Sequence, residues 1–169
     1  MSSLVLVAYA TRHGSTQEVA GAVAASLRER GLDVELQPAR EVQGLERYQA
    51  IVLGTALYMF HFHKDARRFL ARHRAALAER PVAIFALGPI NDVEKEWQGV
   101  RAQFDKELAK FPWLAPVAKE VFGGKFDPAK LRFPYNLLPA HKRLPASDIR
   151  DWKAIHDWAG GVAGKLQPT

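Results

Sequence analysis

Short apolar runs alternate with segments of helical periodicity along the chain. Leu4–Tyr9, Ala50–Gly54 and Val82–Leu87 are continuous apolar stretches, the pattern of strands buried on both faces of a sheet. Residues 33–36 alternate polar and apolar side chains, as a strand nearer an edge does. Lys119–Phe126 is predicted as the last strand, so we expect five strands in all.

The segments between these strands carry apolar residues at helical spacing. We expect helices over Thr16–Arg30, which Gly31 ends, over His63–Ala78 and over Val93–Lys110. A final helix follows Asp148, which we predict as its N-cap. Its apolar stripe is expected to be Ile149, Trp152, Ile155, Ala159, Val162 and Leu166.

Alternating strands and helices of these lengths predict βαβ units and an α/β fold. Right-handed crossovers then place helices on both faces of a five-stranded parallel sheet with the order 2-1-3-4-5, a three-layer sandwich. The 169 residues suit a single domain over 1–169. Residues 127–147 are rich in proline and lack periodicity, which indicates an insertion-like loop.

Composition excludes several kinds of chemistry. The chain has no cysteine, so disulfides, thiolate nucleophiles, iron–sulfur clusters and cysteine zinc sites are ruled out, and redox chemistry would need a bound cofactor. The apolar stretch at Leu4–Tyr9 is too short for a signal peptide or a membrane span. We therefore expect a cytoplasmic protein.

The net charge of +6 is concentrated in two segments. Residues 61–80 and 119–143 each carry six basic and two acidic side chains, and the rest of the chain is slightly acidic. Such a balance favours anionic partners such as phosphates, acidic proteins or anionic lipid headgroups. No recognised nucleic-acid-binding motif accompanies the charge, so we expect no nucleic acid as a partner.

The junction between the first strand and the first helix is suited to a phosphate. The start of a helix offers unpaired N–H groups and the positive end of a dipole, at the edge of a parallel sheet where ligands bind. Neither the nucleoside-triphosphate loop nor the dinucleotide fingerprint is present. The alternative is a capped helix start without a ligand. The residues concerned are Thr11, Arg12, His13, Gly14, Ser15 and Thr16.

This junction resembles the FMN-binding signature of flavodoxins. Every named position of that signature is matched, although Ala8 stands where a larger residue is usual. The matching residues are Tyr9, Thr11, Gly14, Thr16, Ala20 and Val23. The resemblance implies a flavodoxin-like fold with FMN as the cofactor, bound without a covalent link.

Within the flavodoxins, the chain looks most like the menaquinone-dependent protoporphyrinogen IX dehydrogenase branch. The run Leu53–Ala56 leads into His61–Lys64, a segment typical of that branch, and the basic insertion stands where the branch carries its distinguishing loop. The basic pI of about 9.7 also fits, because electron-shuttling flavodoxins are usually acidic. One departure is Tyr58–Phe60, where the branch has an arginine-tyrosine-glycine run.

The resemblance implies roles for three loops. The first loop, Thr11–Thr16, would hold the ribityl phosphate. The second loop, Thr55–Phe60, would lie against one face of the isoalloxazine. The third loop, after the fourth strand, would bind the pyrimidine edge of the isoalloxazine through backbone groups. Tyr58 is the expected stacking aromatic, with Trp97 and Tyr135 as weaker candidates and core packing favoured for Trp97. The second loop comprises Thr55, Ala56, Leu57 and Tyr58, and the third Leu87, Gly88, Pro89, Ile90, Asn91 and Asp92.

Two histidines are candidates for proton transfer near the flavin. His61 and His63 lie two apart, which on an extended segment places both on one side. A metal site is disfavoured because no third ligand is evident, and a role at the start of a helix is the preferred alternative for the pair. We expect no metal. His73 lies on an apolar stripe and is expected to be packed in the core.

These observations predict an FMN-dependent oxidoreductase that passes electrons from an organic substrate to a quinone. Basic segments beside the flavin would stabilise its reduced form and raise its potential. Leu137 and Leu138, bordered by Lys142 and Arg143, are equally consistent with contact to an anionic membrane surface and with packing inside their own loop. The alternatives are an electron carrier to a protein partner and a domain that has lost its flavin.

Overall fold

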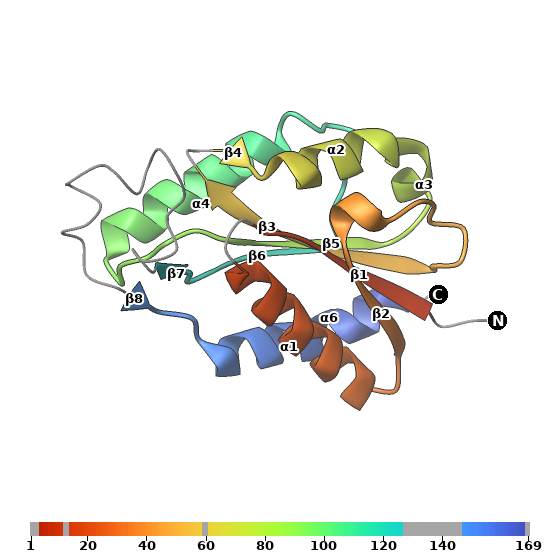
Figure 1. The fold of residues 1–169 in the computed structure, drawn as a ribbon, viewed down its shortest axis with the longest axis horizontal. Helices are drawn as coiled ribbons and strands as arrows, with labels where there is room; N and C mark the ends of the chain where they lie inside the picture. Colours follow the sequence, from red (N-terminus) through yellow and green to blue (C-terminus); the bar gives the residue numbers. More distant parts are fainter. Residues whose placement is uncertain (1–3, 12–13, 59–60, 127–146, 168–169) are drawn as a thin grey trace.

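The computed structural model describes residues 4–11, 14–58, 61–126 and 147–167 (Figure 1). Its centre is a sheet with five parallel strands in the order β2-β1-β3-β5-β6, which confirms the predicted order of parallel strands. A sixth strand, β4 (His61–Phe62), pairs antiparallel with the end of β3. The parallel strands are β1 (Leu4–Ala10), β2 (Asp33–Pro38), β3 (Ala50–Tyr58), β5 (Val82–Leu87) and β6 (Ala118–Phe122).

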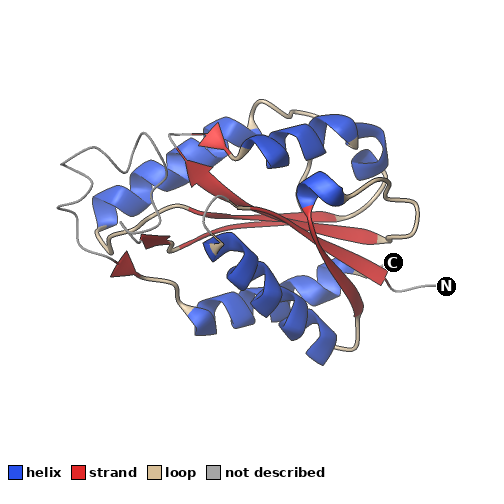
Figure 2. Cartoon of the chain, viewed as in Figure 1, coloured by secondary structure: helices blue, strands red, loops and turns tan. Residues whose placement is uncertain are grey.

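Helices cover both faces of the sheet, as Figure 2 shows. Alternate strand residues such as Val7 and Phe85 face α1 (Ser15–Glu29) and α6 (Trp152–Leu166). Their neighbours, such as Leu53, face the opposite layer. That layer consists of α2 (Lys64–Arg72), α3 (Arg74–Ala78), α4 (Glu94–Leu108) and the short 3-10 helix η1 (Ala39–Glu41). Within the described ranges, none of the helices has the length and apolar character needed to cross a bilayer.

A glycine in the central strand makes room for an aromatic ring. A Cβ at Gly54 would lie 2.2 Å from the ring of Phe85 on the neighbouring strand. Phe85 in turn packs against Phe122 and Trp158, with ring centroids 5.8 Å away in both cases. The aromatic packing under this face of the sheet therefore depends on the absence of a side chain at position 54.

The predicted helix over 63–78 is two helices, because the chain changes direction at His73. His73 has φ −105° and ψ 20°, which ends α2 and starts α3. Its ring is buried, 4.8 Å from the ring of Phe69, and also contacts the backbone of Val42. The expectation that His73 is a packed histidine is confirmed.

The last predicted strand is also divided. Residues 119–126 form the end of β6 and a separate strand β7 (Lys125–Phe126), which pairs antiparallel with β8 (Ser147–Asp148). The chain turns at Gly123 and Gly124, where a Cβ at Gly123 would lie 2.3 Å from the Ile149 carbonyl oxygen. The strands β7 and β8 thus flank the predicted insertion. Most of that insertion, with Tyr135, Leu137 and Leu138, lies outside the described residues.

The predicted N-cap of the final helix was wrong by three residues. Asp151 caps α6, its side chain accepting a hydrogen bond from the Ala154 N–H at 3.0 Å. Asp148 belongs to β8 and pairs instead with Arg150, so Ile149 precedes the helix. Trp152 is 44% exposed rather than on the buried stripe, and it lies 4.8 Å below the Arg150 guanidinium.

Candidate cofactor site

The three loops that the sequence singles out leave the sheet at one edge. Residues paired across the strands place Ala10 beside Thr55, Thr55 beside Ala86, and Ala56 beside Leu87. From β1 the chain crosses to β2 on one side, while from β3 it proceeds to β5 on the other. The carboxyl ends of β1 and β3 therefore flank the switch point of the sheet, where ligands of open α/β folds bind.

The first loop forms a tight turn into α1. Gly14 has φ 88°, a left-handed conformation at the N-cap of the helix. Its N–H donates to the Thr11 Oγ1 at 2.9 Å, which holds the turn closed. A Cβ at Gly14 would meet no atom within 4 Å, so glycine is required here by the backbone angle. Arg12 and His13 lie outside the described residues.

The start of α1 has donor groups free for an anion. Over the described part of the chain, no side chain caps this helix, so the N–H groups of its first turn at Ser15 and Thr16 are available. The one acidic side chain in that turn, Glu18, is paired with Arg150 at 3.0 Å. Uncapped N–H groups, the helix dipole and open space above Gly14 fit a phosphate group.

The second loop is the start of a hairpin. Leu57 pairs with Phe62 and Tyr58 with His61, so the chain reverses over 57–62. Behind the hairpin, the His63 N–H donates to the Ala56 carbonyl at 3.1 Å and lies 3.2 Å from the Thr55 Oγ1. Residues 59–60 and the side chain of Tyr58 fall outside the description, so the stacking role of Tyr58 stays a prediction.

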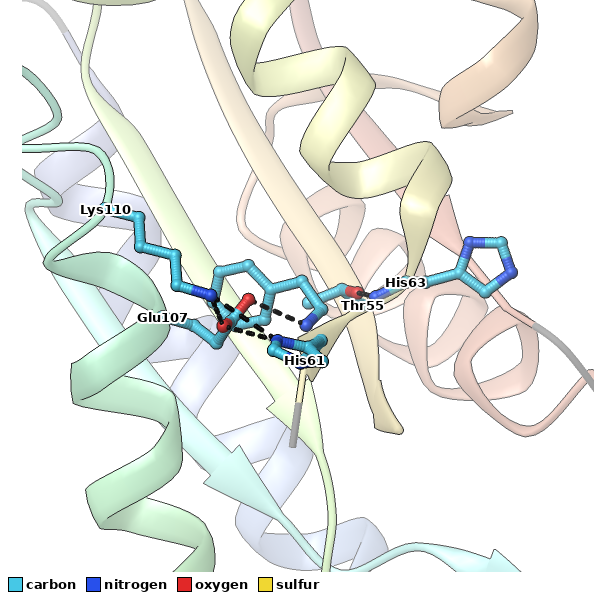
Figure 3. A network of polar contacts seen from close by, with 6 residues as sticks. Thr55, His61, His63, Glu107 and Lys110 are labelled. Atoms are coloured by element: carbon cyan, nitrogen blue, oxygen red, sulfur yellow. Dashed lines mark hydrogen bonds and ion pairs between the residues drawn. The ribbon is translucent and has the colours of Figure 1, made fainter. Parts of the chain in front are cut away.

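A buried carboxylate anchors this hairpin to α4 (Figure 3). Glu107 is 1% exposed, and its Oε2 accepts the Phe62 N–H at 3.1 Å. Its Oε1 lies 3.0 Å from the His61 Nδ1 and also accepts a hydrogen bond from the Lys110 Nζ. Burial acts to raise the pKa of Glu107, but these hydrogen bonds, first the one from Lys110, outweigh it and hold the pKa below its ordinary value.

His61 and His63 do different things. The His63 Nδ1 accepts the Asp65 N–H at 3.1 Å and so caps α2, which confirms the predicted role of a histidine at a helix start. His61 is held by Glu107 and is 54% exposed. Figure 3 shows the two imidazoles well apart, so they do not share one side of a strand as expected. The described residues contain no cluster of three metal-ligating side chains.

The third loop is held by bonds within the protein. The Gly88 N–H donates to the Phe122 carbonyl at 3.3 Å, and the Gly124 N–H donates to the Pro89 carbonyl at 2.6 Å. The Ile90 N–H donates to Glu96 at 2.9 Å. The N–H groups of Gly88 and Ile90 are thus engaged, which leaves other backbone groups of residues 87–92 for the predicted contacts with a flavin.

Asp92, at the end of this loop, bonds to the helix that follows. Its Oδ1 accepts a hydrogen bond from the Trp97 Nε1 at 2.9 Å. Trp97 packs against the core layer, and the Arg101 guanidinium lies over its ring, 5.3 Å from the ring centroid. The packing role preferred for Trp97 is therefore confirmed. Asn91 contributes its carbonyl to a turn, accepting the Val93 N–H at 2.9 Å.

Sequence reasoning missed Glu107 and Lys110. A signal was present, because Glu107 follows Phe104 by three residues and so stands on the apolar stripe of its helix. A carboxylate at such a position implies buried partners. Those partners, His61 and the Phe62 N–H, are more than forty residues away and no local pattern indicates them.

Comparison with known proteins agrees with this site. The flavodoxin domain family model matches residues 6–135. Over 84 residues the chain is 26% identical to protoporphyrinogen IX dehydrogenase (quinone) of Escherichia coli strain K12, a match that covers 48% of this chain and 46% of that protein. The chain thus matches less than half the length of this curated relative.

Solved structures of flavodoxins share the fold. A flavodoxin from the domain Archaea aligns with TM-score 0.58 and 13% identity over 96% of this chain and 98% of that one. A mutant flavodoxin from Pseudomonas aeruginosa aligns with a TM-score of 0.60 and 15% identity over 98% of this chain and 99% of that one. The flavodoxin of Streptococcus pneumonia TIGR4 aligns with a TM-score of 0.56 and 16% identity over 96% of this chain and 97% of that one.

The residues that the family model matches include all three loops. The loop conformation, with a left-handed Gly14 and an uncapped helix start, fits the phosphate of FMN, and FMN is the cofactor. The individual contacts of the three loops with that cofactor stay predictions. Because the family model extends over most of the chain, the chain belongs to the flavodoxin domain family.

Proposed function

We propose that this protein is an FMN-dependent oxidoreductase that oxidises a porphyrinogen-like organic substrate and reduces a quinone. The observation that carries the proposal is the position of His61. This exposed imidazole lies at the carboxyl edge of the sheet, on the hairpin beside the switch point, and a buried carboxylate holds its Nδ1. The similarity to protoporphyrinogen IX dehydrogenase (quinone) supports the same substrate class.

Dehydrogenation requires a proton acceptor as well as an electron acceptor. Each step removes two electrons and two protons from the substrate, and reduction of the quinone consumes the same number of both. FMN, when bound, supplies the redox chemistry, because it takes up an electron pair from one partner and delivers it to another. A carrier that only relays single electrons needs no such oriented proton acceptor.

The residues of the hairpin are suited to that proton transfer. The Glu107 carboxylate accepts a hydrogen bond from the His61 Nδ1, which leaves the Nε2 as the basic nitrogen of this half-exposed ring. The Phe62 N–H on the same carboxylate keeps the hairpin in register with α4. In this proposal His61 receives the substrate proton and Glu107 is a positioning residue.

Turnover of the FMN-saturated protein tests the proposal. With a porphyrinogen as donor and a menaquinone analogue as acceptor, we expect steady oxidation of the porphyrinogen. His61→Gln should lower kcat by about 10²-fold while the bound flavin spectrum is retained, a typical loss for a removed acid–base group. His156→Gln, which changes an exposed histidine on α6, is the matched control and should leave kcat unaltered.

The second candidate function is electron transfer to a protein partner. It is favoured by the fold that the chain shares with flavodoxins along nearly its whole length. No turnover with porphyrinogen and quinone, together with fast electron transfer to an acidic redox protein that His61→Gln does not slow, would favour this carrier. Loss of the flavin altogether would favour neither function.

A further inference from the structure

A groove of about 560 Å³ lies between η1 and α2. Arg68 and Arg72 line it from α2, where their spacing of four places them on one face of the helix. Arg40 lines it from η1, on the other wall. Guanidinium groups therefore face this groove from two separate elements.

These three arginines have no partner within the described chain. Neither a hydrogen bond nor an ion pair involves the guanidinium of Arg40, Arg68 or Arg72 over those ranges. Other arginines are neutralised by carboxylates: Arg47 pairs with Glu35 at 2.6 Å, and Arg150 pairs with two carboxylates. The positive charge around the groove is thus left for an external anion.

Asp65 is the one acidic residue among the described lining residues, and it is turned toward the start of α2. Its side chain is 13% exposed, and its Oδ2 lies 3.8 Å from the Nδ1 of His63. No oxygen of Asp65 comes within ion-pair distance of Arg68. Asp65 therefore forms no ion pair with the arginines, and three basic side chains against one acidic side chain leave the described lining net positive.

The groove is built on packed elements. Its lining includes Phe69 and Val42, both at most 3% exposed, which belong to the core under η1 and α2. His73 also lines it, with its ring against Phe69 and the backbone of Val42. Burial lowers the pKa of His73, and so does the charge of Arg72, so this ring adds an apolar surface rather than another cation.

We propose that this groove binds the phosphate group of a phosphomonoester whose organic part lies along the apolar lining. A phosphate dianion presents several acceptor oxygens and suits guanidinium groups that approach from two walls, whereas a carboxylate is satisfied by one bidentate arginine. The volume is that of a small-molecule site. Nucleic acid is disfavoured, because the two aromatic rings among the described lining residues, Phe69 and His73, are too buried to stack on a base.

This site is separate from the one for FMN. The helix α1 packs on one face of the sheet and α2 with η1 on the other, and none of the described residues of the three cofactor loops lines the groove. A phosphate held by Gly14 and the first turn of α1 therefore does not occupy the groove. The inference goes beyond the proposed oxidoreductase function and does not depend on it, because binding in the groove is measured with FMN already in place.

Calorimetric titration of the FMN-saturated protein with phenyl phosphate tests the proposal. At about 0.15 M salt, exposed charges more than ~8 Å apart are largely screened. We expect a single phosphate site in addition to FMN, and benzoate should bind more weakly. Arg68→Gln with Arg72→Gln should weaken phenyl phosphate binding by about tenfold or more, the scale of a lost charge-assisted contact.

The matched control removes two basic charges outside the groove. Arg67 on α2 and Lys106 on α4 are exposed and do not line it, so Arg67→Gln with Lys106→Gln should change the affinity less than about twofold. Retained flavin absorption and far-UV circular dichroism establish that both double variants fold. Equal losses in the two double variants, or equal affinity for benzoate, would overturn the proposal.

A second arm distinguishes the source of the phosphate. Vesicles of phosphatidylcholine containing phosphatidic acid present the same phosphomonoester on a lipid. Vesicle binding that is lost in the Arg68 and Arg72 variant, without binding of phenyl phosphate, identifies a lipid headgroup as the ligand. Binding of phenyl phosphate without vesicle binding identifies a free small molecule. Binding of neither overturns the proposal.

Discussion

Arg150 donates a hydrogen bond to Glu18 at 3.0 Å, although the two residues are 132 positions apart in the chain. The guanidinium also bonds to both carboxylate oxygens of Asp148, and its side chain is only 4% exposed. Arg150 thus joins the segment after β8, where the chain returns from the predicted insertion, to the first turn of α1. That turn is the one whose uncapped N–H groups we predict to bind the phosphate of FMN.

Arg150→Gln should both destabilise the fold and weaken the binding of FMN. The change leaves Glu18 and Asp148 without their cation. Hydrogen bonds to charged groups contribute about 1.5–3 kcal/mol to the free energy of unfolding. We expect a loss at the lower end of that range, because both carboxylates are half-exposed. An unpaired Glu18 carboxylate beside the phosphate should raise the Kd of FMN several-fold. Urea unfolding and fluorescence titration with FMN measure the two effects.

Lys153→Gln is the control for Arg150→Gln. Lys153 pairs with Asp157 at 2.9 Å on the outer side of α6, where both side chains are largely exposed. Such surface pairs contribute little, so the midpoint of urea unfolding should hardly move. If Arg150→Gln behaved like this control in both measurements, the contact between the insertion segment and α1 would contribute neither to stability nor to FMN binding.

Glu107→Gln should remove part of the pH dependence of stability. The pKa of Glu107 is depressed in the folded protein, so the carboxylate stabilises the fold at pH values above its ordinary pKa of 4.5. That contribution is lost as the pH falls from 4.5 toward the folded pKa. We expect the variant to unfold at lower urea than the parent at pH 7, and the difference to shrink as the solution is acidified below pH 4.5.

Unfolding curves in urea at several pH values measure this effect. Glu94→Gln, an exposed glutamate in the first turn of the same helix, is the control and should leave the pH dependence of stability as it is in the parent. If the free energies of unfolding of the parent and Glu107→Gln differed by the same amount at every acidic pH, Glu107 would stabilise the fold through packing and not through its charge.

The sequence predicts the layers of this fold well because their cause is local. The apolar run at Val82–Leu87 is a strand with those bounds, and the helical stripe after Thr16 is buried as expected. Errors occur where a distant contact decides the local conformation. Ile149 packs its carbonyl against Gly123, and Arg150 reaches Asp148 and Glu18, so the helix begins three residues later than its first acidic residue suggests.

The site was predictable to a similar degree and for a similar reason. The turn at Gly14 follows from hydroxyl and glycine positions within a few residues, and it has the expected form. The hairpin of β3 and β4 was not foreseen, because Tyr58–Phe62 carries no turn signal of its own and is held by Glu107 from another helix. From the sequence alone, His61 is therefore a candidate without a defined position, whereas in the structure Glu107 holds its side chain.

Gly14→Ala should impair the cofactor turn. A left-handed φ of 88° costs an alanine about 1–2 kcal/mol, so the turn should relax away from the geometry in which Thr11 accepts the Gly14 N–H. We expect lower stability without FMN and a higher Kd for FMN. Gly21→Ala in the same helix is the control: its Cβ has open space, and helix propensity should make that variant slightly more stable.

Gly54→Ala should destabilise the sheet through one specific contact. The added methyl group would lie 2.2 Å from the ring of Phe85, and overpacking of this kind costs typically 1–3 kcal/mol. Because the clash involves a single side chain, Phe85→Leu in the same protein should recover part of the loss, so the double variant should be more stable than the sum of the two single changes predicts. A thermal or urea double-mutant cycle measures this coupling. Additive losses would mean that the strand backbone, rather than the Phe85 ring, requires glycine at position 54.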